Sequence, residues 1–293
     1  MKNIKQGLFI FIFKAISMVF CLMPRTISLF IGKQIGIITY MLAIRKNVAK
    51  KNISIAFKDL NKNQQKSILL NCYKHFGMIL IDFLRQQKIN KKNLGQYFVI
   101  NKKYKDILNQ SNGGCIMSAH IGNWEYILPF MGFNNYPMET VIKEQSNPAA
   151  NKFYIQTRTF PNIGLIWKKN ALKNLYRAIE NKKFIGLASD QNAGAKGIKI
   201  SFFDKKSSFP KGAGIFYNRM QCDVLIVLCI MGSDYKYHIF VKKVIINNNN
   251  KTEEEIIEEI NSLYADVLEN KIRQYPHQYF WFHKKWSKKI YKS

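Results

Sequence analysis

The stretch CIMSAHIGNWE, residues 115–125, joins an apolar run to a polar segment that holds one histidine and one carboxylate. The apolar run predicts the end of a buried strand, Gly122 permits a tight turn, and Asn123 is a favourable N-cap for a helix. In one continuous helix His120 and Glu125 would lie about 140° apart. They can meet only if His120 precedes the helix and Glu125 lies in its first turn. The stretch therefore predicts a carboxylate that orients an imidazole.

Short apolar runs alternate with helical stretches on both sides of this turn. The expected strands are Tyr97–Ile100, Cys115–Ser118, Glu139–Ile142, Gly164–Trp167, Phe184–Ala188, Ile198–Phe203, Val224–Ile230 and Tyr237–Val244. The expected helices between them are Trp124–Met131, Ala149–Phe160, Ala171–Asn181 and Gly212–Met220. Apolar residues at helical spacing predict two longer helices, over Asn61–Lys88 and Thr252–Arg273. This alternation predicts a layered α/β fold, α-β-α, with a mostly parallel or mixed sheet.

Two apolar runs near the N-terminus, Gly7–Met23 and Thr26–Ile44, predict membrane-associated helices. Each run is near the lower limit for spanning a bilayer, and each is interrupted by a lysine, Lys14 or Lys33. Basic residues flank both ends of the pair, and the positive-inside rule places both flanks on the cytoplasmic side. A hairpin or an in-plane amphipathic anchor over residues 1–45 satisfies that rule. The alternative is two core helices of a soluble protein.

The chain is strongly basic, with 46 Lys and Arg against 18 Asp and Glu and a formal net charge of +28. Such a surface favours anionic partners, which include nucleic acid, an anionic membrane, phosphorylated substrates and acidic proteins. The lysines are spread along the sequence and no nucleic-acid-binding motif accompanies them. The sequence therefore argues against nucleic acid as the partner.

His120 with Glu125 is the strongest candidate for catalysis, since a neutral imidazole is the usual base for deprotonating a hydroxyl. The alternative is a structural histidine whose hydrogen bonds are satisfied. The other histidines, at positions 75, 238, 277 and 283, repeat no ligand spacing, so we expect no metal site. The sequence has neither the G-x-S-x-G nucleophile motif nor the G-x-x-x-x-G-K-[ST] phosphate loop.

Polar residues also follow other predicted strands, where α/β proteins collect functional side chains. Asn147-Pro148 is followed by Arg158, and Asp190-Gln191 follows the strand that ends at Ala188. The closing stretch, residues 278–286, mixes aromatic and basic residues. It fits either a core aromatic cluster with a solvated basic tail or a contact with a membrane interface or polyanion.

Taken in order, these segments resemble the bacterial lipid A biosynthesis acyltransferases, within the wider group that carries an H-x4-[DE] box. The resemblance covers nearly the whole chain. Its segments are Arg45–Ile53 before Phe57, the His120–Glu125 box, Asn147-Pro148 with Arg158, Asp190-Gln191, Phe202-Phe203 with Pro210–Gly212, and Trp281–Trp286.

The resemblance implies an acyltransferase domain over residues 46–293, behind the anchor, on the cytoplasmic face of the bacterial inner membrane. It implies that His120 is a general base oriented by Glu125, and that a hydroxyl of a lipid A-type glycolipid attacks a fatty acyl thioester. The donor would be acyl carrier protein or coenzyme A, with no further cofactor. The expected substrate contacts are Asn123, Trp124, Arg158, Asp190 and Gln191, with Arg158 holding a phosphate or the developing oxyanion.

Two alternatives stay open at this point. The residues Gly122-Asn123-Trp124, between His120 and Glu125 in the box, are typical of the broad group. The acceptor could therefore be a lysophospholipid or another glycolipid. A basic membrane- or nucleic-acid-binding protein without catalysis is the alternative from a different class. The partners expected for the leading hypothesis are the carrier protein, an anionic glycolipid acceptor and inner-membrane lipid.

Overall fold

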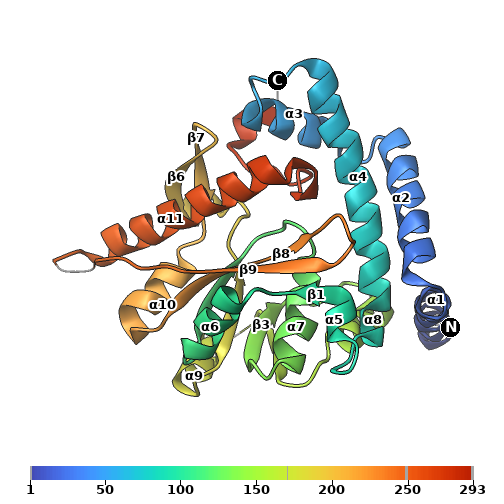
Figure 1. The fold of residues 1–293 in the computed structure, drawn as a ribbon, viewed down its shortest axis with the longest axis horizontal. Helices are drawn as coiled ribbons and strands as arrows, with labels where there is room; N and C mark the ends of the chain where they lie inside the picture. The colour runs from blue at the N-terminus through green and yellow to red at the C-terminus, as the bar shows by residue number, and fades with distance from the viewer. Residues whose placement is uncertain (1, 170, 248–249, 292–293) are drawn as a thin grey trace.

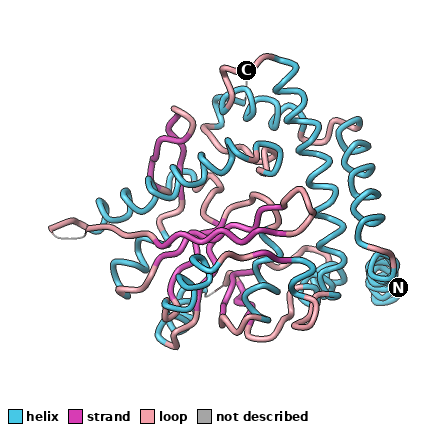
Figure 2. Tube along the Cα trace, viewed as in Figure 1, coloured by secondary structure: helices cyan, strands magenta, loops and turns pink. Residues whose placement is uncertain are grey.

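The computed structural model describes residues 2–169, 171–247 and 250–291, with side chains from Ile10 onward. A seven-stranded sheet in the order β1-β9-β8-β2-β5-β3-β4 forms its centre, with helices on both sides (Figures 1 and 2). All neighbouring strands in it run parallel except β8 and β9. The prediction of a layered α/β fold with a mostly parallel, mixed sheet is therefore confirmed.

The strands of this sheet are β1 (Phe98–Val99), β2 (Gly114–Ser118), β3 (Met138–Ile142), β4 (Ile163–Trp167), β5 (Phe184–Ala188), β8 (Val224–Met231) and β9 (Tyr237–Lys243). A separate antiparallel pair consists of β6 (Ile198–Phe202) and β7 (Lys205–Phe209). Strand β7 was not predicted, because its residues KKSSF show neither an apolar run nor a clean alternation.

The helices are α1 (Lys2–Leu22), α2 (Arg25–Met41), α3 (Lys46–Ala56), α4 (Lys62–Arg85), α5 (Leu94–Tyr97), α6 (Lys102–Gln110), α7 (Ile127–Phe133), α8 (Pro148–Thr157), α9 (Ala171–Glu180), α10 (Gly212–Met220) and α11 (Glu253–Gln274). The two long helices begin at capping boxes, Asn61 with Gln64 for α4 and Thr252 with Glu255 for α11. These boxes satisfy backbone N–H groups that a helix start leaves unpaired. The short helices α3, α5 and α6 were not predicted.

Alternate residues of the central strands face two different layers of the core. Cys115 and Met117 of β2 pack in a cluster with α9, α10 and α11, whereas Ile116 between them packs in a cluster with α4, α6 and α7. All eight residues of β8 are buried, as expected for a strand covered on both faces. The core is thus divided by the sheet, and α11 and α6 lie on opposite sides of it in Figure 1.

Three glycines allow α2 to pack directly against the backbone of α4. A Cβ atom added to Gly36 would lie 2.2 Å from the carbonyl oxygen of Tyr73, and one added to Gly77 would lie 2.0 Å from that of Gly32. We call the contact formed by Gly32, Gly36 and Gly77 the glycine seam. It holds α2 against the domain that carries the central sheet, and the division of the chain at residue 45 stays a prediction.

We expect the substitution Gly77→Ala to lower the free energy of unfolding by about 3 kcal/mol, because the added methyl group cannot fit without moving α2 away from α4. Gly95→Ala in α5 is the matched control, since a Cβ at that position meets nothing within 4 Å. Denaturant unfolding of both variants in detergent measures the difference. If Gly77→Ala unfolds at the same denaturant concentration as the unsubstituted protein, α2 and α4 do not pack as closely at the glycine seam as described.

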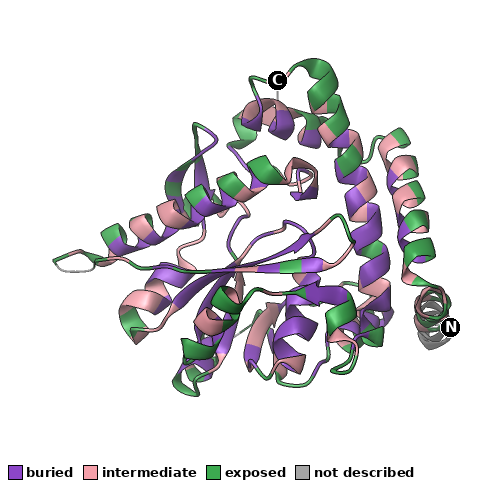
Figure 3. Cartoon of the chain, viewed as in Figure 1, coloured by how far each residue is buried: buried purple, intermediate pink, exposed green. Residues whose placement is uncertain are grey.

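The N-terminal helices expose many large apolar side chains. Figure 3 shows exposed residues along α1 and α2 beside α4, whose middle and C-terminal parts are mostly buried. We define the outer apolar surface by its most exposed members, which are Phe11, Met18, Val19, Leu22, Phe30, Ile38, Met41 and Leu42. In Figure 1 α1 is seen along its axis while α2 runs in the plane of the picture, so the two helices are not antiparallel as in a hairpin, which was one of the two expected arrangements.

One described helix is long and apolar enough to cross a membrane by length and composition. It is Lys62–Lys88, which comprises α4 and the short turn after it, and half of its apolar window is buried inside the protein. A core helix passes the same test. Helices α2 and α3 pass it only when taken together, although the chain bends by 96° between them, and Ile10–Leu22 is a shorter apolar helix.

Candidate active site

The site forms where β2 and β5 end side by side. Ser118 and Ala188 are the last residues of these parallel strands and are paired in register. His120 follows two residues after Ser118, and Asp190 follows two residues after Ala188. Because the carboxyl ends of parallel strands meet at one edge of the sheet, two side chains that are 70 residues apart in sequence become neighbours.

Asp190, and not Glu125, is the carboxylate that is hydrogen-bonded to His120. The distance from His120 Nδ1 to Asp190 Oδ1 is 2.8 Å, and Asp190 is buried. A carboxylate at Nδ1 favours the tautomer whose proton is on Nδ1, which leaves the Nε2 lone pair available. Gln191 Nε2 lies 3.3 Å from His120 Nε2 and can donate a hydrogen bond to that lone pair. Asp190 was expected to contact substrate, and its burial behind the imidazole gives it a different place.

Burial and charge act in opposite directions on this pair. Burial lowers the pKa of His120, but the charge of Asp190, the hydrogen bond to it and the charge of Glu125 outweigh burial, so the pKa lies above its usual value. Burial raises the pKa of Asp190, yet the charge and hydrogen bond of His120 and the charge of Lys285 bring it below its usual value. The pair therefore consists of an ionised carboxylate and a strengthened base.

Glu125 is held by a different partner, which corrects the predicted His120–Glu125 contact. Arg158 donates to both oxygens of Glu125, with 2.7 Å from Nε to Oε2 and a second bond from Nη2 to Oε1. The indole Nε1 of Trp124 also donates to Oε1, at 3.1 Å. A guanidinium that binds a carboxylate through two parallel bonds fixes it firmly. The carboxylate of Glu125 is thus hydrogen-bonded to Arg158 and not to His120. Its charge still raises the pKa of the nearby imidazole.

This pairing also changes what Arg158 can do. Its charge is balanced by Glu125 inside the protein, and its expected contact with a phosphate or with the developing oxyanion stays a prediction. The ring of Tyr154 lies 3.4 Å from its guanidinium carbon. Its remaining nitrogen, Nη1, is buried without a hydrogen-bond partner among the described residues. Arg158 thus keeps one donor available beside the site.

The turn between His120 and Glu125 has the shape that the glycine predicted, and Asn123 stands at the N-cap position, but its side chain does not cap the helix. Gly122 has φ +61°, and a Cβ there would lie 2.0 Å from the carbonyl oxygen of Cys229. Asn123 makes no capping hydrogen bond, and a single 3₁₀ turn, Trp124–Tyr126, precedes α7.

Asn123 was expected to contact substrate, but its side chain is fully buried and belongs to a polar network inside the protein. Its amide donates to the hydroxyl of Tyr237 at 3.1 Å, and that hydroxyl donates to Asp82 of α4 at 2.6 Å. Arg25 at the start of α2 binds both oxygens of Asp82, at 3.0 and 2.7 Å. A continuous polar network therefore joins the first turn of α2 to the turn that carries His120.

A cavity of about 190 Å³ opens beside the imidazole. His120, Trp124, Glu125 and Arg158 form its polar part, and the ring of Trp124 lies 4.7 Å from that of His120. The rest of its lining is mostly apolar and includes Ile127, Leu128, Met138, Val141, Ile142 and Leu187. The structure thus brings Trp124, Arg158 and Gln191 to the site, where their contacts with substrate stay predictions, and it adds a largely apolar space beside them.

The closing stretch contributes a residue that the sequence analysis did not place in the site. Lys285 is buried, donates to the backbone carbonyl of Asp190, and lies 3.5 Å from the centre of the Phe209 ring. Burial lowers its pKa to about 7. Trp281 and Trp286 are fully buried in the core, so this stretch is a core cluster rather than a membrane contact. In the sequence, Lys285 could not be told from the lysines of a solvated basic tail. Only its burial in the structure shows that it belongs to the site.

Comparison with known proteins matches the sequence of this chain to one family. A family model described as bacterial lipid A biosynthesis acyltransferase matches residues 3–288. The chain belongs to this family. A lipid A biosynthesis palmitoleoyltransferase of Escherichia coli K12 is 20% identical over 270 residues, which are 90% of this chain and 86% of that protein. A lipid A biosynthesis acyltransferase of Shigella flexneri matches to the same extent. Membership makes this chain an acyltransferase of the lipid A biosynthesis type.

Proposed function

We propose that this acyltransferase moves a fatty acyl chain from an acyl thioester to a hydroxyl of a lipid A-type glycolipid, with His120 as the general base. The observation that carries the proposal is the Nδ1 hydrogen bond from His120 to buried Asp190, which leaves Nε2 beside a largely apolar cavity. The acceptor hydroxyl would replace Gln191 as the partner of Nε2. The donor is an acyl group on acyl carrier protein or on coenzyme A.

The reaction needs one proton relay and no covalent enzyme intermediate. His120 Nε2 takes the hydroxyl proton while the oxygen attacks the thioester carbonyl carbon, and the imidazolium that forms is stabilised by Asp190. The carbon–sulfur bond then breaks, and the departing sulfur takes the proton from Nε2. The products are an ester and a free thiol, and the base returns to its neutral form.

Arg158 is positioned to stabilise the negative charge that develops on the carbonyl oxygen. Its Nη1 is a buried donor without a partner among the described side chains and backbone groups, and Arg158 lines the cavity. A donor aimed at the oxyanion strengthens as the charge forms. Glu125 fixes the guanidinium through its other nitrogens and so acts as a positioning residue for Arg158.

The outer apolar surface supports association with the inner membrane at its cytoplasmic face. Phe11 is 69% exposed and Met41 is 74% exposed, and exposed apolar patches of this kind mark membrane or protein contacts. The helices lie along the domain, so we propose an in-plane anchor. The strongly basic surface suits an anionic bilayer, a phosphorylated glycolipid and an acidic carrier protein.

The test uses the purified full chain in detergent with two donors and two acceptors. Acyl carrier protein and coenzyme A thioesters of one fatty acid are each incubated with a lipid A precursor and with a lysophospholipid. The proposal expects release of free thiol together with a lipid A precursor heavier by one acyl chain in mass spectrometry. Acylation of the lysophospholipid alone would favour the alternative acceptor, and no transfer with either donor would overturn the reaction.

A further inference from the structure

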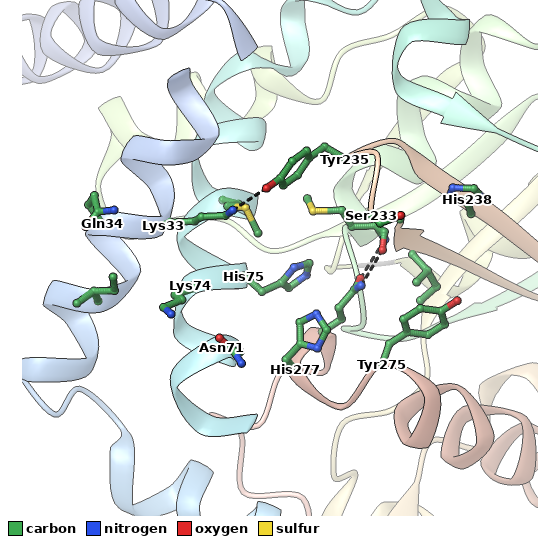
Figure 4. Close-up of a pocket in the computed structure, with 16 residues that line it drawn as sticks. Lys33, Gln34, Asn71, Lys74, His75, Ser233, Tyr235, His238, Tyr275 and His277 are labelled. Atoms are coloured by element: carbon green, nitrogen blue, oxygen red, sulfur yellow. Dashed lines mark hydrogen bonds between the residues drawn. The ribbon is translucent and has the colours of Figure 1, made fainter. Parts of the chain in front are cut away.

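A cavity of about 840 Å³ lies away from His120. It is bordered by α2, by α4, by the turn between β8 and β9, and by the short helix Pro276–Gln278 (Figure 4). Lys33 and Lys74 lie on its helical side in Figure 4, and Ser233 and Tyr275 lie opposite. We call it the Lys33–Lys74 cavity.

This cavity is lined by cations and neutral hydrogen-bonding groups. None of the sixteen described residues that line it is an aspartate or a glutamate. Lys33 Nζ lies 2.6 Å from the hydroxyl of Tyr235, which directs the ammonium group without neutralising it. The carboxylate of the nearby turn, Asp234, is 3.6 Å from His238 Nε2. The lining therefore favours an anion.

The glycine seam separates this cavity from the site that contains His120. Ile35 and Thr39 of α2 line a smaller apolar pocket, of about 270 Å³, that also includes Phe280. The ring of Phe280 lies 6.1 Å from that of His120, so this pocket is on the catalytic side of α2. Lys33 lies on the other flank of the helix. A ligand in the Lys33–Lys74 cavity therefore does not occupy the place of the reacting substrates.

The cavity borders the outer apolar surface. Along α2, Phe30 and Gly36 are each three residues from Lys33, which places them about 60° to either side of it on the helix. Gly36 faces α4 in the glycine seam, whereas Phe30 is 61% exposed. Lys33 therefore stands between the buried face of α2 and the apolar face that is open to the surroundings.

We propose that the Lys33–Lys74 cavity binds the phosphate group of an anionic membrane phospholipid, whose acyl chains lie along the exposed face of α2. The site is separate from the acyl-transfer site and fixes the depth and orientation of the N-terminal helices in the bilayer. Two lysines beside an apolar helix face match the two parts of such a lipid, a charged headgroup and apolar chains. The inference rests on the membrane association in the proposed function.

The test compares two double variants with equal loss of charge. Lys33→Gln with Lys74→Gln alters the cavity, and Lys102→Gln with Lys103→Gln alters two exposed lysines of α6. Binding is measured by co-sedimentation with phosphatidylcholine vesicles that contain or lack phosphatidylglycerol. We expect the cavity variant to bind phosphatidylglycerol vesicles about 30-fold more weakly than the unsubstituted chain, and the α6 variant less than about threefold more weakly.

Further measurements keep the inference separate from folding and from catalysis. The unfolding midpoint should be the same for both double variants, and Tyr235→Phe, which keeps both charges, should weaken vesicle binding less than the cavity variant does. Acyl transfer in detergent should be unchanged in the cavity variant. If the unsubstituted chain binds these vesicles and the two double variants bind them equally, the headgroup site is wrong whether or not acyl transfer occurs.

Two other outcomes would also overturn the proposal. Inorganic phosphate could raise the unfolding midpoint of the unsubstituted chain but not of the cavity variant, while vesicle binding by the two double variants stays equal. The cavity would then take free phosphate. If instead the cavity variant lost binding to acyl carrier protein and kept its vesicle binding, the cavity would be a docking point for that acidic protein.

Discussion

Substitution of His120 by alanine should lower the rate of acyl transfer by a factor on the order of 10³, because the acceptor hydroxyl loses the group that takes its proton. The imidazole contacts Asp190 and Gln191 at the end of the sheet, and its removal leaves both strands in place. The rate of thiol release from the acyl donor, measured with saturating acceptor, gives the change in kcat.

A matched control separates catalysis from folding in this experiment. His238→Ala removes a half-exposed histidine whose partner is the exposed Asp234, and it should leave acyl transfer unchanged. Both variants should keep the unfolding midpoint of the unsubstituted chain, and His120→Ala, which lies outside the Lys33–Lys74 cavity, should partition into membranes as the unsubstituted chain does. Acylated lipid at the normal level in mass spectra of the His120→Ala reaction would rule out the general-base role.

Substitution of Asp190 by asparagine should have the second largest effect, also on the order of 10³ in kcat/KM. The carboxylate fixes the tautomer that leaves Nε2 free, and it stabilises the imidazolium that forms during proton transfer. An asparagine at this position keeps the size of the side chain and removes the charge. The loss should appear with every acyl donor, because Asp190 acts through His120 and does not touch the substrate.

The pH profile gives this variant a readout that a purely structural role would not move. The base must be neutral, so activity rises as pH increases through the pKa of His120, which Asp190 helps to raise above its usual value. Removal of that charge lowers the pKa, and the acidic limb of the kcat/KM profile should move to lower pH. Because the unsubstituted protein has the higher pKa, a move to higher pH would contradict the assignment.

Glu125→Gln serves as the comparison, since it removes the carboxylate that the sequence first paired with His120. Its charge also raises the pKa of His120, but it makes its hydrogen bonds to Arg158 and Trp124. We expect a smaller displacement of the acidic limb than in Asp190→Asn. If the acidic limb moved as far in Glu125→Gln as in Asp190→Asn, or farther, Glu125 and not Asp190 would be the residue that orients His120.

Most of the layered architecture could be predicted from local patterns. The fully apolar run of β8 and the helical periodicity of α11 reflect burial that each segment needs wherever it packs. The positive φ of Gly122 could be predicted for the same reason, because a turn after a buried strand requires a residue without a Cβ. The polar strand β7 was missed because it has no such pattern, and α6 was missed because its apolar residues, Tyr104, Ile107 and Leu108, are few in a short helix.

The partners of the site residues could not be read in the same way. Sequence proximity paired His120 with Glu125, but the side-by-side placement of β2 and β5 gives Asp190 to His120. Glu125 pairs with Arg158, and Lys285 reaches the backbone of Asp190 from the end of the chain. These contacts join segments 33 to 95 residues apart. Their formation depends on strand order and helix placement, which local periodicity does not encode.

The sequence by itself determined the reaction class of this protein through its resemblance to the lipid A biosynthesis acyltransferases, because that resemblance rests on short motifs and their order along the chain. The tertiary structure decided which carboxylate serves His120, and it placed the Lys33–Lys74 cavity across the glycine seam from the site. The physical reason is the short range of these interactions. Hydrogen bonds and ion pairs act over a few ångströms, and only the folded chain brings distant residues within that distance.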